Sequence, residues 1–576
     1  MAGGYRIELL KRQAGAVKGG QRAQRSPNFD RPAAKVWSDE PILSLGDDGV
    51  ILGYLFKRGP PSGRVERLDE NELARLHASH GRSILSDYWG SYVMVRAEPD
   101  GHVTVLRDPS GGLPCYFRHD RDVVVISDDI TKIASRSSTS VNYIEIARLL
   151  ASADAPGRDT CVSGVTELIA GECIRIVRGA VGIEQWWSPW DHVRKLVSIG
   201  FSEAAEGLRE LLLDTVGAWA ECFDRILLGV SGGLDSSIVA AAASRSAADL
   251  VCLTLVGPDP EGDERRYARC LTDKLGLQLT EAFYSLAEID VSRAPAPHHP
   301  WPNAGYFKQS IGVIHDRLQR ELSIDAHFSG NGGDGIFFGS RSALPFIDRL
   351  LVEGPRWALT ETLRDLSDLT GADARTVLGH AWARYRHDRG RHAVRFDMSG
   401  ISDAFAAQVG KVGSRHPWLR IPDNALPGNT THIAFLLRSH RSLELYPRAS
   451  ASPHVAPLLS QPIVEFCLSI PSWYWVMGGA NRALARAAFT DILPETILRR
   501  SLKGGPGGFN LALYRENASV VEKLLREGRL AQAGLLDPSL LDRAADPSWR
   551  GTERIYRLLS LGSAEAWTRW WCDDCG

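Results

Sequence analysis

The sequence predicts an α/β protein in two parts, a strand-rich α+β part followed by a doubly wound parallel sheet with a helical C-terminal part. Up to about residue 190, short alternating or β-branched runs are separated by turn signals such as 46–49 (GDDG) and 99–101 (PDG). From Phe201 onward, apolar strand-like runs alternate with helical stretches, the pattern of parallel βαβ units, and beyond about residue 340 helices dominate. The 576 residues therefore predict one domain over 1–195 and a second over 200–576.

The composition excludes several classes of protein. Lys and Arg total 67 against 69 Asp and Glu, so no global positive field favours nucleic acid. No run approaches the roughly 18 apolar residues that a membrane-spanning helix needs. The nine cysteines are scattered and odd in number, as in a reducing compartment. We therefore expect a cytoplasmic protein that uses neither nucleic acid nor a membrane.

The second part opens with a glycine-rich turn between a strand and a helix. A helix over 203–223 and an apolar strand over 226–230 lead into Ser-Gly-Gly-Leu-Asp-Ser-Ser at 231–237, and a helix over 238–246 follows. Backbone N–H groups at such a turn, with the positive end of the helix dipole, form a cradle for an anion. Asp235 is suited to hold Mg²⁺ that bridges phosphate oxygens. Further strands are expected over 250–256 and 277–284, with a helix over 262–275 between them.

A second glycine-rich loop, Ser-Gly-Asn-Gly-Gly-Asp-Gly at 329–335, follows another strand-like run. It also fits the dinucleotide fingerprint GxGxxG. That fingerprint opens the first βαβ unit of its fold, whereas here a third strand has already passed, which disfavours a nicotinamide site.

The two loops together resemble the synthetase domain of the asparagine synthetase family, which belongs to the PP-loop ATP pyrophosphatases. The resemblance implies ATP and Mg²⁺ as cofactors and places the metal on Asp235 and Asp334. It implies that the pyrophosphate portion of ATP is bound by Ser231, Gly232, Gly233, Ser236 and Ser237. It also implies that the adenosine pocket is lined by Val230, Val256, Ser329 and Gly330.

The resemblance extends to both ends of the chain. The stretches 89–93, 106–114 and 126–128 look like the family's glutamine-amidotransferase domain, of the Ntn type. Residues 456–465 and the basic positions Arg482, Arg486 and 500–503 are similar to its late motifs. The family's glutaminases need a cysteine directly after the initiator Met, whereas this sequence begins Met1-Ala2. The amidotransferase-like domain is therefore expected to be degenerate and unable to supply ammonia.

A second departure points to a sub-family. Asn331 stands where asparagine synthetases carry Glu and β-lactam synthetase carries Tyr, and an amide cannot accept a proton as a base would. With the stretches 456–465 and 478–489, these features look like the lasso-peptide cyclases. That resemblance implies adenylation of an Asp or Glu side chain of a precursor peptide, whose N-terminal amine then closes a macrolactam. It also implies a leader peptidase and a leader-binding protein as further partners.

Three residues are expected to act in the chemistry. Lys503 is the family's candidate for stabilising the developing negative charge, and Glu444 is a candidate for orienting or deprotonating the amine. Asn331 occupies the position of the missing base. A peptide α-amine, with a pKa of about 7.7–8.0, needs little help to lose a proton near neutral pH. The alternatives are an ammonia-dependent asparagine synthetase, a β-lactam-type synthetase, and a non-catalytic protein that kept the fold.

Overall fold

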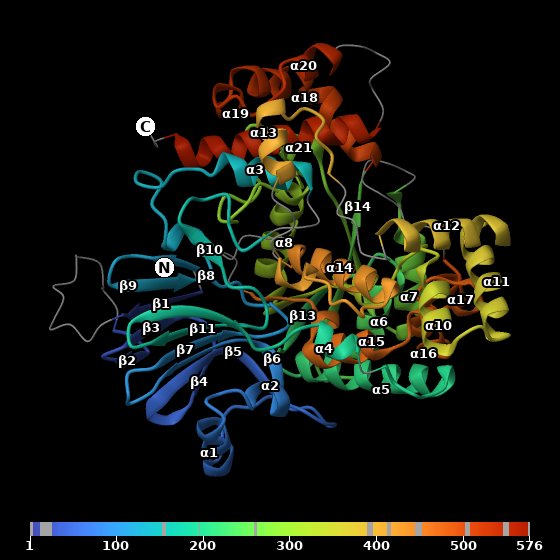
Figure 1. The fold of residues 1–576 in the computed structure, drawn as a ribbon, viewed down its shortest axis with the longest axis horizontal. Helices are drawn as coiled ribbons and strands as arrows, with labels where there is room; N and C mark the ends of the chain where they lie inside the picture. Colours follow the sequence, from blue (N-terminus) through green and yellow to red (C-terminus); the bar gives the residue numbers. More distant parts are fainter. Residues whose placement is uncertain are drawn as a thin grey trace.

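The computed structural model describes most of the chain, with short gaps between the described ranges. These are residues 4–11, 26–152, 157–194, 196–257, 262–303, 305–388, 396–411, 416–443, 452–500, 507–544 and 552–573. Figure 1 shows stacked antiparallel sheets in the N-terminal part and a larger part in which helices surround a parallel sheet.

Two six-stranded antiparallel sheets form the N-terminal part, in the orders β10-β8-β9-β1-β3-β2 and β12-β11-β7-β6-β5-β4. Alternating side chains of β1 are buried, and they pack against the second sheet to form one core with residues such as Val93 and Ile174. Helices α1 and α2 cover the outer face of the second sheet, and α3 lies against the first. The strands are β1 (Tyr5–Leu10), β2 (Phe29–Arg31), β3 (Ala34–Ser38), β4 (Ile42–Ser44), β5 (Gly49–Lys57), β6 (Tyr88–Ala97), β7 (Val103–Arg107), β8 (Tyr116–His119), β9 (Val123–Ser127), β10 (Val165–Glu167), β11 (Glu172–Val177) and β12 (Ala180–Gln185); the helices are α1 (Glu70–Ala78), α2 (Ile84–Asp87) and α3 (Tyr143–Ala151).

A five-stranded parallel sheet, in the order β15-β14-β13-β16-β17, lies at the centre of the larger part. Its strands are β13 (Arg225–Gly229), β14 (Asp249–Val256), β15 (Gln278–Phe283), β16 (Ala326–Phe328) and β17 (His454–Val455). Ile226 and Leu228 face α5 (Phe201–Ala220), α6 (Leu234–Ala243) and α7 (Arg265–Leu275), whereas Leu227 faces α8 (Lys308–Leu322) on the opposite side. Helices on both faces confirm the predicted doubly wound parallel sheet. The strand order reverses beside β13, so the carboxyl end of β13 is the expected ligand crevice.

Helices account for most of the remaining secondary structure of the described chain. They are α4 (Trp190–Val193), α5 (Phe201–Ala220), α6 (Leu234–Ala243), α7 (Arg265–Leu275), α8 (Lys308–Leu322), α9 (Gly333–Ile336), α10 (Leu344–Glu353), α11 (Ala358–Thr370), α12 (Ala374–Asp388), α13 (Asp403–Lys411), α14 (Pro427–Arg441), α15 (Gln461–Ser469), α16 (Ala483–Ala488), α17 (Glu495–Leu498), α18 (Gly507–Glu527), α19 (Arg529–Gln532), α20 (Ser539–Ala544) and α21 (Thr552–Cys572). The last helices share a core with α3, where Trp567 and Trp571 are each 1% exposed. The C-terminal helices therefore pack on the N-terminal part as well. Among the described helices, none combines the length and the apolar character needed to cross a membrane.

A buried carboxyl group on α10 caps α14. Asp348 is fully buried, and its Oδ1 accepts a hydrogen bond from the backbone N–H of Gly428 at 2.8 Å. Its Oδ2 accepts one from the Ser472 hydroxyl at 2.6 Å. Burial raises the pKa of Asp348 to about 7.

This carboxyl makes stability depend on pH. Because its pKa is higher in the folded protein than in the unfolded chain, its contribution is present at low pH and is lost as pH rises from about 4 towards 7. In the wild type, this group should lower the free energy of unfolding by about 2–3 kcal/mol between pH 5 and pH 8. Asp348→Asn keeps the acceptor for Gly428 without the charge, so we expect this decrease to be absent in the variant. Urea unfolding at both pH values measures this, with the exposed Asp423→Asn as control. Parallel pH profiles in wild type and Asp348→Asn would contradict it.

Candidate functional site

The first predicted loop has the geometry of an anion cradle. β13 ends at Gly229, and the chain turns through Ser231 and Gly232 into α6, whose N-cap is Gly233. Gly232 has φ +60°, and a Cβ there would lie 2.2 Å from the Cβ of Tyr267, so only glycine fits. The N-terminus of the ten-residue α6 thus opens at the carboxyl end of the central strand, where the positive end of the helix dipole favours a phosphate.

The second predicted loop lies against the first. It follows β16, turns at Gly332 with φ +94° and continues into α9. A Cβ on Gly330 would lie 2.5 Å from the backbone nitrogen of Ser236, and one on Gly333 would lie 2.3 Å from Cγ of Asp235. The two glycines therefore allow the loops to touch.

The two predicted metal ligands, Asp235 and Asp334, both contact one positively charged side chain, that of Arg482. Nη1 of Arg482 lies 3.0 Å from both carboxylate oxygens of Asp235 and 2.8 Å from Oδ1 of Asp334. Asp235 is buried and Asp334 is exposed, so the pair lies at the surface of the crevice. Carboxylate oxygens are the donors that Mg²⁺ prefers, and their shared contact with one guanidinium nitrogen shows that both can face a single positive charge. The donor set therefore fits Mg²⁺.

Two arginines reach the first loop from far along the chain. Besides Arg482, Arg500 donates from Nη1 to the backbone oxygen of Ser231 at 3.0 Å and from Nη2 to Glu264 at 2.6 Å. Its guanidinium lies 4.1 Å from the ring centroid of Tyr267. Sequence analysis identified both arginines as parts of basic motifs without assigning them a role. Their basic character was the signal in the sequence that they contribute to the site. The residues that they contact could not be predicted from the sequence.

A cavity of about 150 Å³ lies at the carboxyl ends of the parallel strands. Two predicted site residues, Ser329 and Asn331, line it, and the backbone N–H of Asn331 donates to the Ser329 hydroxyl at 3.4 Å. Val230 and Val256 are buried at the ends of the adjoining strands. The described lining residues are Leu227, Gly229, Leu253, Leu255, His315, His327, Phe328, Ser329, Asn331, Leu443, His454, Val455 and Ala456. None of these is Lys, Arg, Asp or Glu.

Two of the predicted catalytic residues, Glu444 and Lys503, lie outside the described residues. The nearest described residues in the sequence are Leu443, which lines the cavity, and Arg500, which donates to the backbone oxygen of Ser231 in the first loop. Their roles remain predictions.

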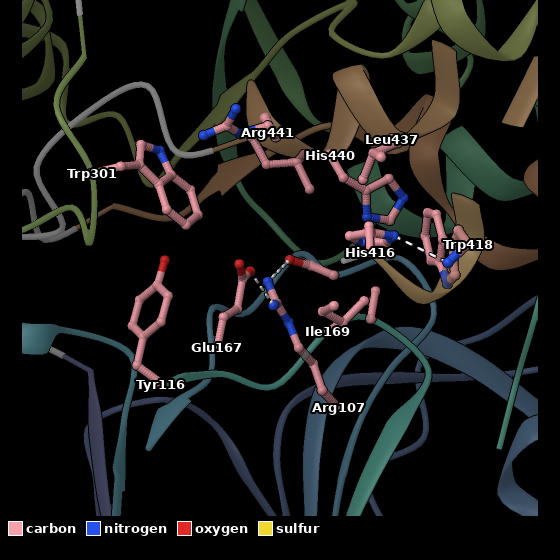
Figure 2. Close-up of a pocket in the computed structure, with 13 residues that line it drawn as sticks. Arg107, Tyr116, Glu167, Ile169, Trp301, His416, Trp418, Leu437, His440 and Arg441 are labelled. Atoms are coloured by element: carbon pink, nitrogen blue, oxygen red, sulfur yellow. Dashed lines mark hydrogen bonds and ion pairs between the residues drawn. The ribbon is translucent and has the colours of Figure 1, made fainter. Parts of the chain in front are cut away.

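A second, smaller cavity of about 40 Å³ lies between the N-terminal sheets and α14 (Figure 2). Arg107 and Glu167, paired at 2.8 Å, line it from below, and His416 and His440 line it from the other side. Burial lowers the pKa of His440 to about 3. Leu443 borders both cavities and is part of the wall between them.

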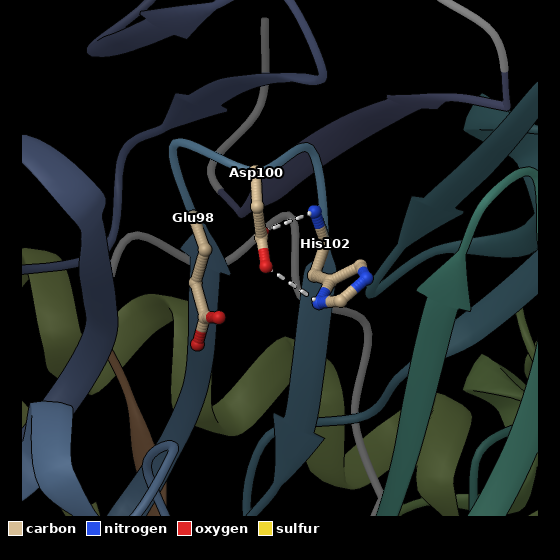
Figure 3. Close-up of side chains that lie close together, drawn as sticks. All are labelled: Glu98, Asp100 and His102. Atoms are coloured by element: carbon tan, nitrogen blue, oxygen red, sulfur yellow. Dashed lines mark hydrogen bonds and ion pairs between the residues drawn. The ribbon is translucent and has the colours of Figure 1, made fainter.

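A cluster of possible metal ligands also lies on the β6–β7 turn, formed by Glu98, Asp100 and His102 (Figure 3). Nδ1 of His102 lies 2.9 Å from Oδ2 of Asp100, and Glu98 is paired at 3.1 Å with the buried Arg96. The Arg96 charge opposes a second cation there. This cluster is on the N-terminal sheets, so we assign it no part in the nucleotide crevice.

The cysteines of the N-terminal part are poorly suited to act as nucleophiles. Its three cysteines, Cys115, Cys161 and Cys173, are all buried. Burial raises the pKa of each thiol, that of Cys115 to about 11. Because the thiolate is the reactive form, none of the three is primed for attack on an amide.

We therefore expect no hydrolysis of glutamine. Incubation of the purified protein with glutamine, ATP and Mg²⁺ should release glutamate only at the rate of an enzyme-free blank. Glutamate release that disappears in Cys115→Ala would contradict this and would identify Cys115 as the nucleophile.

A family model that matches this sequence agrees with the geometry of the two loops. The family model described as asparagine synthase matches residues 207–569, which is more than half of the chain. No curated protein matches. A solved structure titled "Structure of the allosteric regulatory enzyme of purine biosynthesis" is 12% identical, covers 57% of this chain and 83% of its own, and has a TM-score of 0.20. Members of the matched family form AMP and pyrophosphate from ATP. The chain belongs to the asparagine synthase family of ATP-dependent ligases.

Proposed function

We propose that this protein is a peptide macrolactam synthetase of the lasso-cyclase type. It adenylates the side chain of an Asp or Glu in a precursor peptide, and the N-terminal amine of that peptide then displaces AMP. The observation that carries this proposal is Asn331, which lines the cavity at the strand ends and cannot accept a proton as a base would. An amine of modest pKa, such as a peptide α-amine, has the least need of such a base.

The first half-reaction needs stabilisation of charge at the phosphates. The peptide carboxylate attacks the α-phosphorus, and the bond to the β-phosphate oxygen breaks to release pyrophosphate. The backbone N–H groups of Gly232 and Gly233, with the dipole of α6, would bind the phosphates. Asp235 and Asp334 would hold Mg²⁺, which offsets negative charge on the phosphate oxygens. Lys503 is proposed to add a further cation.

The second half-reaction joins the acyl carbon to the amine nitrogen and releases AMP. A peptide α-amine has a pKa of about 7.7–8.0, so a substantial fraction is already nucleophilic near neutral pH. This fits Asn331, which lines the cavity and cannot act as a base. Glu444 is proposed to orient the amine. A leader peptidase and a leader-binding protein, which would deliver the leader-free peptide, remain proposed partners.

Mass spectrometry of purified enzyme with ATP, Mg²⁺ and candidate core peptides tests the function. We expect a product lighter by one water, with AMP rather than ADP, and no such product when the peptide amine is acetylated. Formation of asparagine from free aspartate and ammonia at a comparable rate would instead favour the ammonia-dependent asparagine synthetase.

A further inference from the structure

Arg482 contacts the two carboxylates of the predicted metal site through a single atom. Its Nη1 donates to both oxygens of Asp235 at 3.0 Å and to Oδ1 of Asp334 at 2.8 Å. An arginine that binds a carboxylate most strongly uses two parallel N–H groups, one for each oxygen. Here one nitrogen serves both acids, and Nε is buried without a hydrogen-bond partner among the residues that the structure describes. Arg482 therefore acts on this pair as a point charge, as a metal ion would.

The backbone around Arg482 keeps its guanidinium at this place. Arg482 is the N-cap of α16 and has φ +55°, in the left-handed region that residues with a side chain rarely adopt. The preceding residue is held by Arg486, whose Nε and Nη2 donate to the backbone oxygen and to Oδ1 of Asn481, each at 2.7 Å. Such a backbone conformation persists only where its surroundings enforce it, so the fold determines the position of Arg482.

Burial makes this contact a strong competitor of a metal ion. The side chains of Arg482 and Asp235 are 15% and 11% exposed, so solvent screens their attraction little. The carboxylate oxygens that accept from Nη1 are the atoms that would bind Mg²⁺. A guanidinium and a divalent cation cannot share one position, and like charges a few ångströms apart repel each other. A free divalent cation must therefore displace Arg482 without offering its charge a new partner.

A nucleotide changes this balance because it brings anions of its own. Its phosphates are expected at the N-terminus of α6, whose first turn includes Asp235. Phosphate oxygens accept hydrogen bonds from the planar fork of an arginine through two N–H groups. By turning towards them, Arg482 would gain a partner for Nε and release the carboxylates.

We propose that Arg482 is a positioning residue that excludes free divalent cations from Asp235 and Asp334 and admits the metal only in complex with ATP. The guanidinium passes from the carboxylates to the phosphates as the complex enters, so its charge is never left unpaired. The inference goes beyond the proposed function, because it concerns the ATP site and holds whichever carboxylate is activated.

Binding of Mn²⁺ alone, without nucleotide, tests this inference, since electron paramagnetic resonance measures the free Mn²⁺ directly. Arg482→Gln removes the positive charge, and we expect its dissociation constant for Mn²⁺ to be about tenfold or more below that of wild type. Arg482→Lys keeps a cation and should bind Mn²⁺ as weakly as wild type. Structural damage would not tighten the binding of a metal ion, so this gain distinguishes the proposed role from a structural one.

Two further variants place the effect at this site. Arg482→Gln combined with Asp235→Asn should lose the gain, because one of the two carboxylates is then neutral. The matched control is Arg209→Gln, which removes an arginine that lies 3.7 Å from the exposed carboxylate of Asp491. Its Mn²⁺ affinity should stay within about twofold of wild type, because an exposed ion pair contributes little.

Mn²⁺ binding of equal strength in wild type and Arg482→Gln overturns the inference. A gain that persists with Asp235→Asn, or that appears equally in Arg209→Gln, also overturns it. If Arg482→Gln does not fold, Arg482→Asn replaces it under the same criteria, because asparagine is neutral and tolerates positive φ. Absence of a macrolactam with every peptide would overturn the proposed function alone, since the Mn²⁺ assay contains no peptide.

Discussion

Asp235→Asn and Asp334→Asn are each expected to lower ATP–pyrophosphate exchange by about 10³-fold or more while the protein stays folded. Both carboxylates contact one nitrogen of Arg482, at 3.0 and 2.8 Å, so both can face a single cation. An asparagine keeps the shape but removes the charge that would hold Mg²⁺, and several kcal/mol of charge stabilisation at the phosphates should be lost. Exchange assays with a Mg²⁺ titration measure the effect.

The control is Asp491→Asn, an exposed carboxylate that lies 3.7 Å from Arg209. It should leave exchange unchanged, because an exposed ion pair contributes little. Circular dichroism and thermal unfolding check that the site variants fold. Near-wild-type exchange in either site variant at saturating Mg²⁺ would remove that residue from the metal site.

Gly330→Ala is expected to lower exchange about 10²-fold by separating the two loops. The added Cβ would lie 2.5 Å from the backbone nitrogen of Ser236 and 2.9 Å from the carbonyl carbon of Asp235. Both contacts are with backbone atoms, which cannot rotate away as a side chain can. A displacement of about 1 Å between groups that grip one substrate is enough for a loss of this size. Exchange measured over a range of ATP concentrations detects it.

Gly217→Ala provides the matched control, because a Cβ there would meet nothing within 4 Å and Gly217 lies on helix α5. It should keep full exchange and gain about 1 kcal/mol of stability from the better helix propensity of alanine. Wild-type exchange in Gly330→Ala would show that the loops need not touch for adenylation.

The local order of elements around the nucleotide crevice was predictable from the sequence. Apolar runs such as 226–230 form buried parallel strands because neither of their faces meets water. The stretch 231–237 forms a turn and a helix N-terminus because glycine tolerates positive φ and hydroxyl groups bond the nearby backbone. The second loop follows the same rules, and both loops are at the carboxyl edge because parallel strands end there together.

Local patterns could not predict which distant side chains complete the crevice. Arg482 and Asp235 are 247 residues apart, and their contact depends on how α16 packs against α5. In the sequence, His315, His327 and His454 are isolated polar residues near apolar runs. Their stacking depends on α8 crossing to the opposite face from α6, and on β17 joining the sheet beside β16.

The sequence by itself determined the strand–loop–helix units, the two glycine loops and the carboxylates within them, because these follow from backbone sterics and hydrophobic periodicity over a few residues. The tertiary structure alone decided that Arg482 spans the carboxylates, that Arg500 reaches Ser231, and that the His327 ring is buried between His315 and His454. Burial and partner choice arise only when segments far apart in the chain pack together, since the same side chain is solvated and charged in water but desolvated and neutral inside.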